Sequence, residues 1–362
     1  MDENRVCELS QKRKVALSKD RHNIYALRFS PDAKELAVGF GNGAIQLLKP
    51  DSGMLKKDVF VGHRTQEAAM CLSYHPCRHS LLFVGNADGN IRIYDMELPS
   101  DPVSITGGGF TVEENNEINA LDFSLDGSIF ATAGKDKCIR LYDSRTNQLC
   151  NMYKAPDYSS GDDQSVTSGH TSRIFALKFH PDDYHLFITG GWDRSLMVWD
   201  KRMAKGARRA INGPHICGSG IDIQGNKMVT GSWAARNSLQ LWDLRNLKVE
   251  KTLPFPASEA QGEFLYAARF CCSDTVIAGG SGTGSAHVIN FKTHQGRQTA
   301  VAKGWLETCS QTPSKLPCIT CLEVLGGIYL NNKAVQTVDT ARNGKLIAVG
   351  GVGGNLHIAE LL

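Results

Sequence analysis

The chain has 362 residues, of which 41% are apolar and 21% charged, and its formal net charge is +3. This length allows one large β domain or two ordinary ones, and the apolar content argues against a disordered chain. The nearly balanced charge argues against nucleic-acid or membrane-surface binding, and the sequence shows no long apolar span or apolar leader. Eleven scattered cysteines fit a reducing compartment better than a disulfide framework, so we expect an intracellular protein, cytoplasmic, nuclear or both.

In chain order, the sequence repeats one pattern of three apolar runs. An alternating run is followed by a turn with Pro or Asp, then by a run that ends in small residues, an Asp turn, and a run that closes on an aromatic residue and Asp. Clear copies occupy residues 62–95, 118–143 and 169–200. Alternation at period two, broken by turns about every 8–12 residues, predicts short antiparallel strands. Aligned on the closing position, seven units end at Lys49, Asp95, Asp143, Asp200, Asp243, Asn290 and Glu360.

The closing positions lie 43 to 70 residues apart, a spacing that suits the four-stranded repeats of a propeller. Units two to four close on "IRIYD", "IRLYD" and "LMVWD", and the chain resembles the WD-repeat β-propeller family over almost its whole length. Units one, six and seven lack this ending. The resemblance implies an all-β fold, with residues 1–362 as a single propeller of seven blades. The last unit supplies three strands, so we expect "VCELSQKRKVAL" (6–17) to add the fourth and close the ring.

Three insertions interrupt the units, at residues 98–116, 153–168 and 297–333. The first two are rich in Gly, Ser, Asp and Pro and are expected to be surface loops; the third is a longer loop, either a contact element or a tolerated insertion. The third contains Cys309, Cys318 and Cys321 but no second C-x-x-C and no His pair nearby. A strand with apolar cysteines over "CITCLEV" is therefore favoured over a zinc site, and we expect no metal and no cofactor.

Unit four carries His170, Thr189, Asp193 and Trp199 where the resemblance implies a structural hydrogen-bonded tetrad. Such a network ties strands together because buried polar groups must find partners. A catalytic role for His, Asp and Thr is disfavoured. A propeller enzyme would also need titratable groups that converge on the central channel, whereas the side chains expected there are aromatic, amide and hydroxyl. We therefore expect no enzymatic activity.

The resemblance implies partner binding on the wider face, around the mouth of the channel. The inner-strand position of Phe175 corresponds to a ring of Tyr25, Met70, Asn119, Phe175, Ser219, Tyr266 and Gln336. The position before the turn Asp adds Ala87, Lys135 and Trp192, and unit five adds Trp233. Aromatic residues and Arg are the usual anchors of interfaces, although these rings could instead pack on loops between blades. The expected binding residues are Tyr25, Met70, Lys135, Arg173, Phe175, Trp192, Trp233 and Tyr266.

Units three, four and five end in "YDSR", "WDKR" and "WDLR", which place Arg145, Arg202 and Arg245 two residues after the closing Asp, on the narrower face. Residues 187–202 match the box shared by many WD-repeat substrate receptors of cullin-4 ubiquitin ligases, where the Arg contacts the adaptor subunit. Residues 130–145 match except at Ala131, and the "AARN" turn of unit five breaks the spacing. Charged residues in solvated turns also explain these arginines.

The sequence thus predicts a non-enzymatic scaffold that captures peptides or loops of other proteins on the wider face. Two alternatives are a substrate receptor of a cullin-4 ligase, with the adaptor subunit as partner, and a structural component of a large complex such as a ciliary one. No nucleic-acid or membrane partner is expected.

Overall fold

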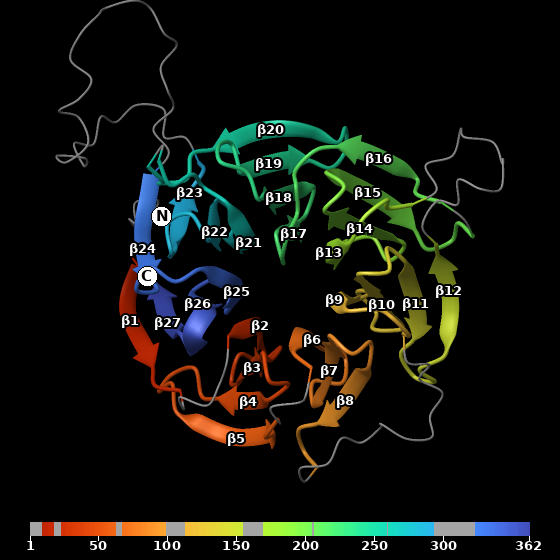
Figure 1. Cartoon of the computed structure of the whole chain (residues 1–362), viewed down its shortest axis with the longest axis horizontal. Coiled ribbons are helices and arrows are strands. Elements are labelled where there is room, and N and C mark those ends of the chain that lie inside the picture. Colours follow the sequence, from red (N-terminus) through yellow and green to blue (C-terminus); the bar gives the residue numbers. More distant parts are fainter. Residues whose placement is uncertain are drawn as a thin grey trace, which may run out of the picture.

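The computed structural model describes residues 9–17, 23–62, 67–98, 113–154, 169–204, 206–258, 260–292 and 323–362. In these ranges the regular structure is β strand, apart from the short 3-10 turn Val352–Gly354. Seven antiparallel sheets stand around a central axis as the blades of a propeller (Figure 1). The predicted all-β fold of seven blades is confirmed. No helix in the described ranges has the length and apolar character needed to cross a bilayer.

In blades 1 to 6 the strands follow chain order from an inner strand beside the axis to the rim, whereas in blade 7 the first strand of the chain lies outermost. Blades 1 to 3 consist of β2 (Ile24–Phe29), β3 (Leu36–Phe40), β4 (Ile45–Leu48) and β5 (Leu55–Phe60); β6 (Ala69–Tyr74), β7 (Leu81–Asn86) and β8 (Ile91–Asp95); and β9 (Ile118–Phe123), β10 (Ile129–Gly134), β11 (Ile139–Asp143) and β12 (Leu149–Tyr153). Blades 4 and 5 consist of β13 (Ile174–Phe179), β14 (Leu186–Gly191), β15 (Ser195–Asp200) and β16 (Arg209–Asn212); and β17 (Ile221–Gln224), β18 (Lys227–Gly231), β19 (Leu239–Asp243) and β20 (Lys248–Leu253). Blades 6 and 7 consist of β21 (Leu265–Cys272), β22 (Thr275–Gly280), β23 (Ser285–Asn290) and β24 (Glu323–Tyr329); and β25 (Val335–Ala341), β26 (Leu346–Gly351), β27 (Leu356–Leu361) and β1 (Leu9–Val15).

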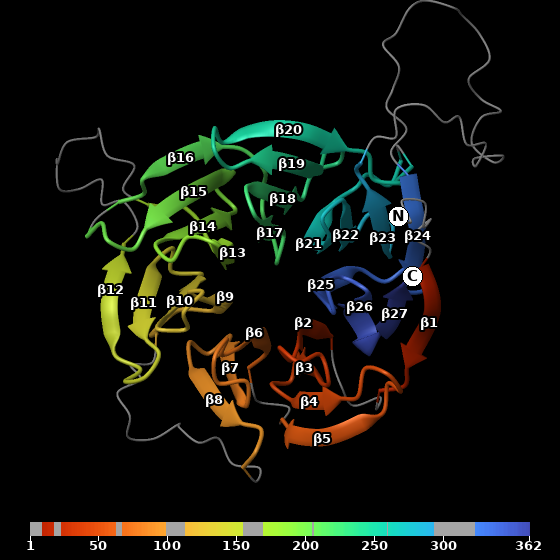
Figure 2. The ribbon, with the colours of Figure 1, turned by 180° about the vertical axis from the view of Figure 1, so that it is seen from behind.

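The two ends of the described chain share blade 7. Strand β1 pairs antiparallel with β27, from Leu9 opposite Leu361 to Val15 opposite Leu356. Seen from either side, the first strand lies beside the last (Figures 1 and 2). Val15 is buried in the core between blades 7 and 1, and Leu9 packs against the core between blades 6 and 7. The predicted closure by an N-terminal strand is confirmed.

The hydrophobic core is divided among the joints between blades. The buried apolar residues form seven clusters, and each cluster combines residues of two neighbouring blades. At the joint of blades 3 and 4, for example, Leu141 and Tyr153 pack with Phe187 and Trp199. Every blade therefore buries its two faces against two neighbours.

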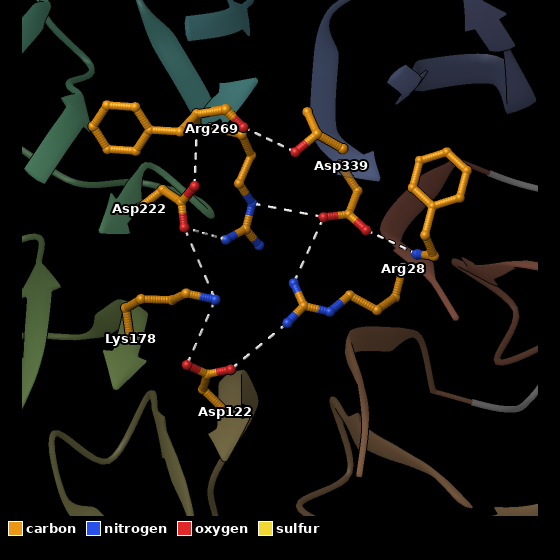
Figure 3. A network of polar contacts seen from close by, with 9 residues as sticks. Arg28, Asp122, Lys178, Asp222, Arg269 and Asp339 are labelled. Carbon is orange, nitrogen blue, oxygen red and sulfur yellow. Dashed lines mark hydrogen bonds and ion pairs between the residues drawn. The ribbon is translucent and has the colours of Figure 1, made fainter. Parts of the chain in front are cut away.

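The channel is lined by a closed ring of alternating charges that the sequence analysis did not foresee (Figure 3). Six inner strands supply its members in the order Arg28, Asp122, Lys178, Asp222, Arg269 and Asp339. Nitrogen–oxygen distances between successive members run from 3.2 to 3.9 Å, and Asp339 returns to Arg28. Strand β6 places the buried Ser73 at the equivalent position, so blade 2 contributes no charge.

Each carboxylate of this charged ring also binds the backbone of another blade. Asp122 accepts the N–H of Phe179, Asp222 that of Phe270, and Asp339 that of Phe29, at 2.8–3.0 Å. Charge-assisted bonds of this kind are stronger than neutral ones. The charged ring therefore fastens blade 3 to blade 4, blade 5 to blade 6 and blade 7 to blade 1.

Two of the expected loops contribute residues to blades 3 and 6. The loop expected at 98–116 ends in Glu113 and Asn116, which are only 2% and 3% exposed. The insertion expected at 297–333 includes β24, which pairs with β23 as the outer strand of blade 6. Without β24 the edge of β23 would be unpaired, which explains why a strand forms there.

The remaining insertions fall largely beyond the described ranges. Of the loop expected at 153–168, Tyr153 ends β12 and is buried, and residues 155–168 lie outside the described residues. Cys309, Cys318 and Cys321 also lie outside them.

Deleting residues 1–15 removes β1, exposes the edge of β27 and takes Val15 out of its core. We expect the melting temperature to fall by more than about 5 °C, because a loss of several kcal/mol shifts a chain of this size by that much or more. Deletion of residues 1–8 leaves β1 intact and serves as the control in differential scanning calorimetry. Equal melting of the two truncated proteins would contradict the role of β1 in closure.

Candidate functional site

Five aromatic rings from blades 4, 5 and 6 meet at one end of the propeller. Trp192 and Trp233 are stacked, with centroids 6.1 Å apart, and His215 stands edge-on to both at 4.7 and 6.0 Å. Phe175 lies 5.9 Å from Trp192, and Phe264 lies 5.1 Å from Trp233. We call these five residues the aromatic cluster. Trp192 is 46% and Trp233 36% exposed, so two large rings face solvent side by side.

Backbone hydrogen bonds fix the turns that carry these rings. The Trp192 N–H donates to the carbonyl of Arg173 at 2.9 Å, and the Trp233 N–H donates to that of His215 at 2.8 Å. The Trp192 turn then closes tightly at Arg194, whose φ is 57°. The indole rings are therefore held at defined positions although they are partly solvated.

The sequence predicted that Phe175, Trp192 and Trp233 lie close together, and the structure brings these three into contact. It did not predict His215 or Phe264. Both precede an inner strand and lie outside the aligned strand pattern, so no repeat position pointed to them. In "EFLY" the aromatic residue Phe264 directly precedes the inner strand, and this position could have identified it from the sequence.

The channel opens beside the aromatic cluster. A cavity of about 210 Å³ is lined at its mouth by six members of the predicted ring, Tyr25, Met70, Asn119, Phe175, Ser219 and Gln336. The seventh, Tyr266, is half-buried and does not line this cavity. The predicted mouth is thus formed by six of the seven expected side chains.

Lys135 and Arg173 lie on the rim and share one carboxylate. Glu117 accepts from Lys135 Nζ at 2.7 Å and from Arg173 Nη1 at 2.9 Å. The hydrogen bond from Lys135 and the charge of Arg173 lower the pKa of Glu117, against the effect of its burial. Burial and the charge of Arg194 lower the pKa of His215 below its ordinary value.

Titratable groups do converge on the channel, contrary to the sequence analysis. They form the charged ring, in which each member pairs with two groups of opposite charge. Lys178 is the member whose pKa is lowered, by burial, although Asp122 opposes the effect. Within the described residues, no group of three or more His, Cys, Asp or Glu side chains could hold a metal ion. The charged groups of the channel therefore have a structural role, because they pair with one another.

The four residues expected to form a tetrad are bonded to one another. His170 lies 2.8 Å from Asp193 through Nδ1 and 2.7 Å from Thr189 through Nε2, and Trp199 Nε1 donates to Thr189 at 2.7 Å. Burial acts to raise the pKa of Asp193, but the hydrogen bond and charge of His170, together with the backbone N–H groups of Thr171 and Ser195, lower the pKa of this carboxyl group overall. His170 and Thr189 are fully buried. The network joins the entry to β13 with β14 and β15.

Blade 3 contains a matching network built on a different residue. Glu113 accepts from Thr132 at 2.5 Å, Tyr142 at 2.8 Å, Asn116 at 2.7 Å and Arg140 at 3.2 Å. Glu113 precedes its Thr by 19 residues, as His170 does in blade 4. The 19-residue spacing could have identified Glu113 from the sequence, but residues 98–116 were expected to form a loop.

The three predicted arginines lie in turns at the opposite end of the blades. Strand β15 separates Trp192 from Arg202, a span of roughly 17–20 Å at about 3.3 Å per residue. We therefore name the two ends the Trp192 face and the Arg202 face. Arg202 and Arg245 each bind their own closing Asp through two nitrogens, at 2.6–3.0 Å. Hydrogen bonds from Arg202 lower the pKa of Asp200 to about 2.

The closing Asp before Arg145 accepts a side-chain hydroxyl, whereas those before Arg202 and Arg245 accept a guanidinium group. The first of these, Asp143, accepts hydrogen bonds from the backbone N–H groups of Arg145 and Thr146 and from the Thr146 hydroxyl. The side chains of Arg202 and Arg245 are 62% and 73% exposed. Their cations therefore reach solvent while they remain paired.

Comparison with known proteins finds a known repeat in part of this chain. The model for the WD domain, G-beta repeat, matches residues 55–95, 109–143 and 161–200. The chain is 23% identical over 230 residues to "Cell division cycle 20.1, cofactor of APC complex" of Arabidopsis thaliana, which covers 63% of this chain and 46% of the relative. It is 30% identical over 178 residues to "Protein tipD" of Dictyostelium discoideum, and this match covers 48% of this chain and 24% of the relative. It is 26% identical over 174 residues to "GATOR2 complex protein WDR24" of Xenopus laevis, and this match covers 47% of this chain and 19% of the relative. In each case, the matched region is less than half of the relative's length.

Substitution Asp193→Ala removes an acceptor from His170 and from the backbone N–H groups of Thr171 and Ser195. We expect the free energy of unfolding to fall by about 1–3 kcal/mol, because buried donors lose their partner. Urea denaturation measures this. Asp182→Ala, at an exposed position of the same blade, should change it by less than about 0.5 kcal/mol. Equal midpoints for the two variants would show that the network does not stabilise the fold.

Proposed function

This chain is a WD-repeat β-propeller of seven blades, and from that fold we propose that it is a non-enzymatic scaffold which captures a peptide or loop of a partner protein on its aromatic cluster. Propellers of this family generally act as interaction scaffolds. The observation that carries the proposal is the exposed, stacked pair of Trp192 and Trp233 beside the channel mouth.

The aromatic cluster has the properties of an interface anchor. Contiguous exposed apolar surface marks interaction sites, and Trp and Arg dominate the binding energy of interfaces. The two indoles are already stacked on pinned turns, so little side-chain entropy is lost when a partner covers them. The amide and hydroxyl groups at the channel mouth add polar contacts beside this apolar surface. A segment that lies across blades 4 to 6 would cover both.

The expected intracellular location is part of the same proposal. Six cysteines in the described ranges are free thiols, which suits a reducing compartment: Cys71, Cys77, Cys150, Cys217, Cys271 and Cys272. Relatives named as a cofactor of the APC complex and as a GATOR2 complex protein support a place in a larger assembly.

A second candidate function is that of a substrate receptor of a cullin-4 ubiquitin ligase. It is supported by the exposure of Arg202 and Arg245 in equivalent turns of the Arg202 face. Their pairing with Asp200 and Asp243 weakens this support, because an adaptor would have to compete for the guanidinium groups. Recovery of the cullin-4 adaptor with the wild-type protein, and its loss with Arg145→Ala and Arg202→Ala combined, would establish this function.

Substitution of Trp192 or Trp233 by Ala should weaken partner binding by about 2 kcal/mol or more, roughly 30-fold in Kd, because each ring is an anchor of the proposed interface. Affinity purification with quantitative mass spectrometry identifies the partner, and calorimetry measures its Kd. Tyr184→Ala removes an aromatic ring of similar exposure (49%) from the Arg202 face and is the matched control. The proposal fails if a partner of the wild-type protein is retained by both Trp variants or is lost equally with Tyr184→Ala.

A further inference from the structure

The wall of the channel between blades 5 and 6 contains two buried polar atoms without a hydrogen-bond partner. They are Ser219 Oγ and Arg269 Nε, and both residues line the cavity that opens beside Phe175. The Ser219 carbonyl accepts the N–H of Ala268 at 3.4 Å, which places it next to Arg269 on the same wall. Buried donors of this kind are normally bonded. The Ser219 hydroxyl can donate to an acceptor that enters from the Trp192 face, whereas Arg269 Nε lies 3.9 Å from Asp339 Oδ1 in the charged ring.

The charges around this cavity favour an anionic acceptor. Its lining includes all three cations of the charged ring, Arg28, Lys178 and Arg269, but only one of the three carboxylates, Asp122. Asp222 and Asp339 line a second cavity, next to Phe29 and Pro31, which the same three cations also line. The cavity beside Phe175 is therefore lined by more cationic than anionic side chains.

Cations also lie at the rim of the aromatic cluster, where Arg173 is paired with Glu117. Arg173 lies two residues before Phe175 in the chain. Burial is the larger cause of the lowered pKa of His215, and the charge of Arg194 is the second. A basic side chain of a partner would meet cations both at the rim and inside the channel. A carboxylate would be attracted at both levels.

We propose that the segment captured by the aromatic cluster carries an Asp or Glu side chain, and that its carboxylate enters the channel mouth and accepts a hydrogen bond from Ser219 Oγ on the wall shared with Arg269. This proposal rests on the proposed function of the aromatic cluster and specifies its partner. Hydrogen bonds to an ionised acceptor are roughly twice as strong as neutral ones. The carboxylate thus adds selectivity to an anchor that is otherwise apolar.

The test begins with a library of random 12-residue peptides displayed on phage and selected on the full-length protein. We expect the selected peptides to share an Asp or Glu at a fixed spacing from an aromatic or aliphatic residue. Fluorescence polarisation then measures the Kd of each synthetic peptide. Replacement of the shared acid by Asn or Gln should raise Kd about tenfold or more, the effect expected of a charge-assisted hydrogen bond.

Substitution at Ser219 links that acid to the channel. Ser219→Ala should raise Kd by about tenfold for the acidic peptide and change it little for the neutral one, so the two changes are coupled. Ser219→Asp should weaken the acidic peptide further through repulsion. Ser273→Ala, at an exposed turn of blade 6, is the matched control and should leave Kd unchanged. Equal melting temperatures of the variants confirm that folding is intact.

The outcomes separate this inference from the proposed function. If the selected peptides lose affinity with Trp192→Ala but carry no shared acid, or are indifferent to Ser219→Ala, the inference is wrong and the aromatic cluster remains the binding site. If they bind independently of Trp192 and Trp233, both proposals are wrong. A library that yields no binder for the wild-type protein also counts against both.

Discussion

Closure of the ring is the constraint on which the rest of this structure depends. Each of the seven hydrophobic clusters spans two neighbouring blades, so no blade completes its core alone. The last joint closes because β1 crosses to β27 and brings Val15 with it. The charged ring repeats this closure at the axis, where three carboxylates each bind both the cations beside them and the backbone of another blade.

This closed frame determines what the two faces can do. The buried networks of His170 and Glu113 hold the turns of blades 4 and 3, which present Trp192 and Lys135 at the channel mouth. The charged groups of the channel and the polar groups of the His170 and Glu113 networks are paired within the fold, whereas two indoles are left exposed on turns that the backbone fixes. An exposed aromatic surface on a rigid frame suits the proposed capture of a partner.

Most of the fold could be predicted from the sequence because the repeat register is local. The alternation of apolar residues and the closing Asp recur in every well-matched unit, and the tetrad occupies fixed places within one unit. The charged ring was missed, although each of its members lies three residues after a member of the predicted mouth, as Arg28 does after Tyr25. Repeat register could have aligned these positions, but only closure of the propeller brings a nitrogen of Arg28 and an oxygen of Asp122 within 3.7 Å. Glu113 was missed since its segment resembles a loop, and Phe264 since it lies outside the strand pattern. Strand propensity and the period of apolar residues predict where strands form. They do not predict which side chains of different blades come into contact.

A partner bound at the aromatic cluster should lie within reach of a crosslinker placed in that cluster. Site-specific photo-crosslinking in cells tests it most directly, with benzoylphenylalanine replacing Phe264 at the edge of the cluster or Tyr184 on the Arg202 face. The account predicts a discrete adduct from position 264, its loss when Trp192→Ala is added, and no such adduct from position 184. No adduct from position 264, or the same adduct from position 184, would contradict it.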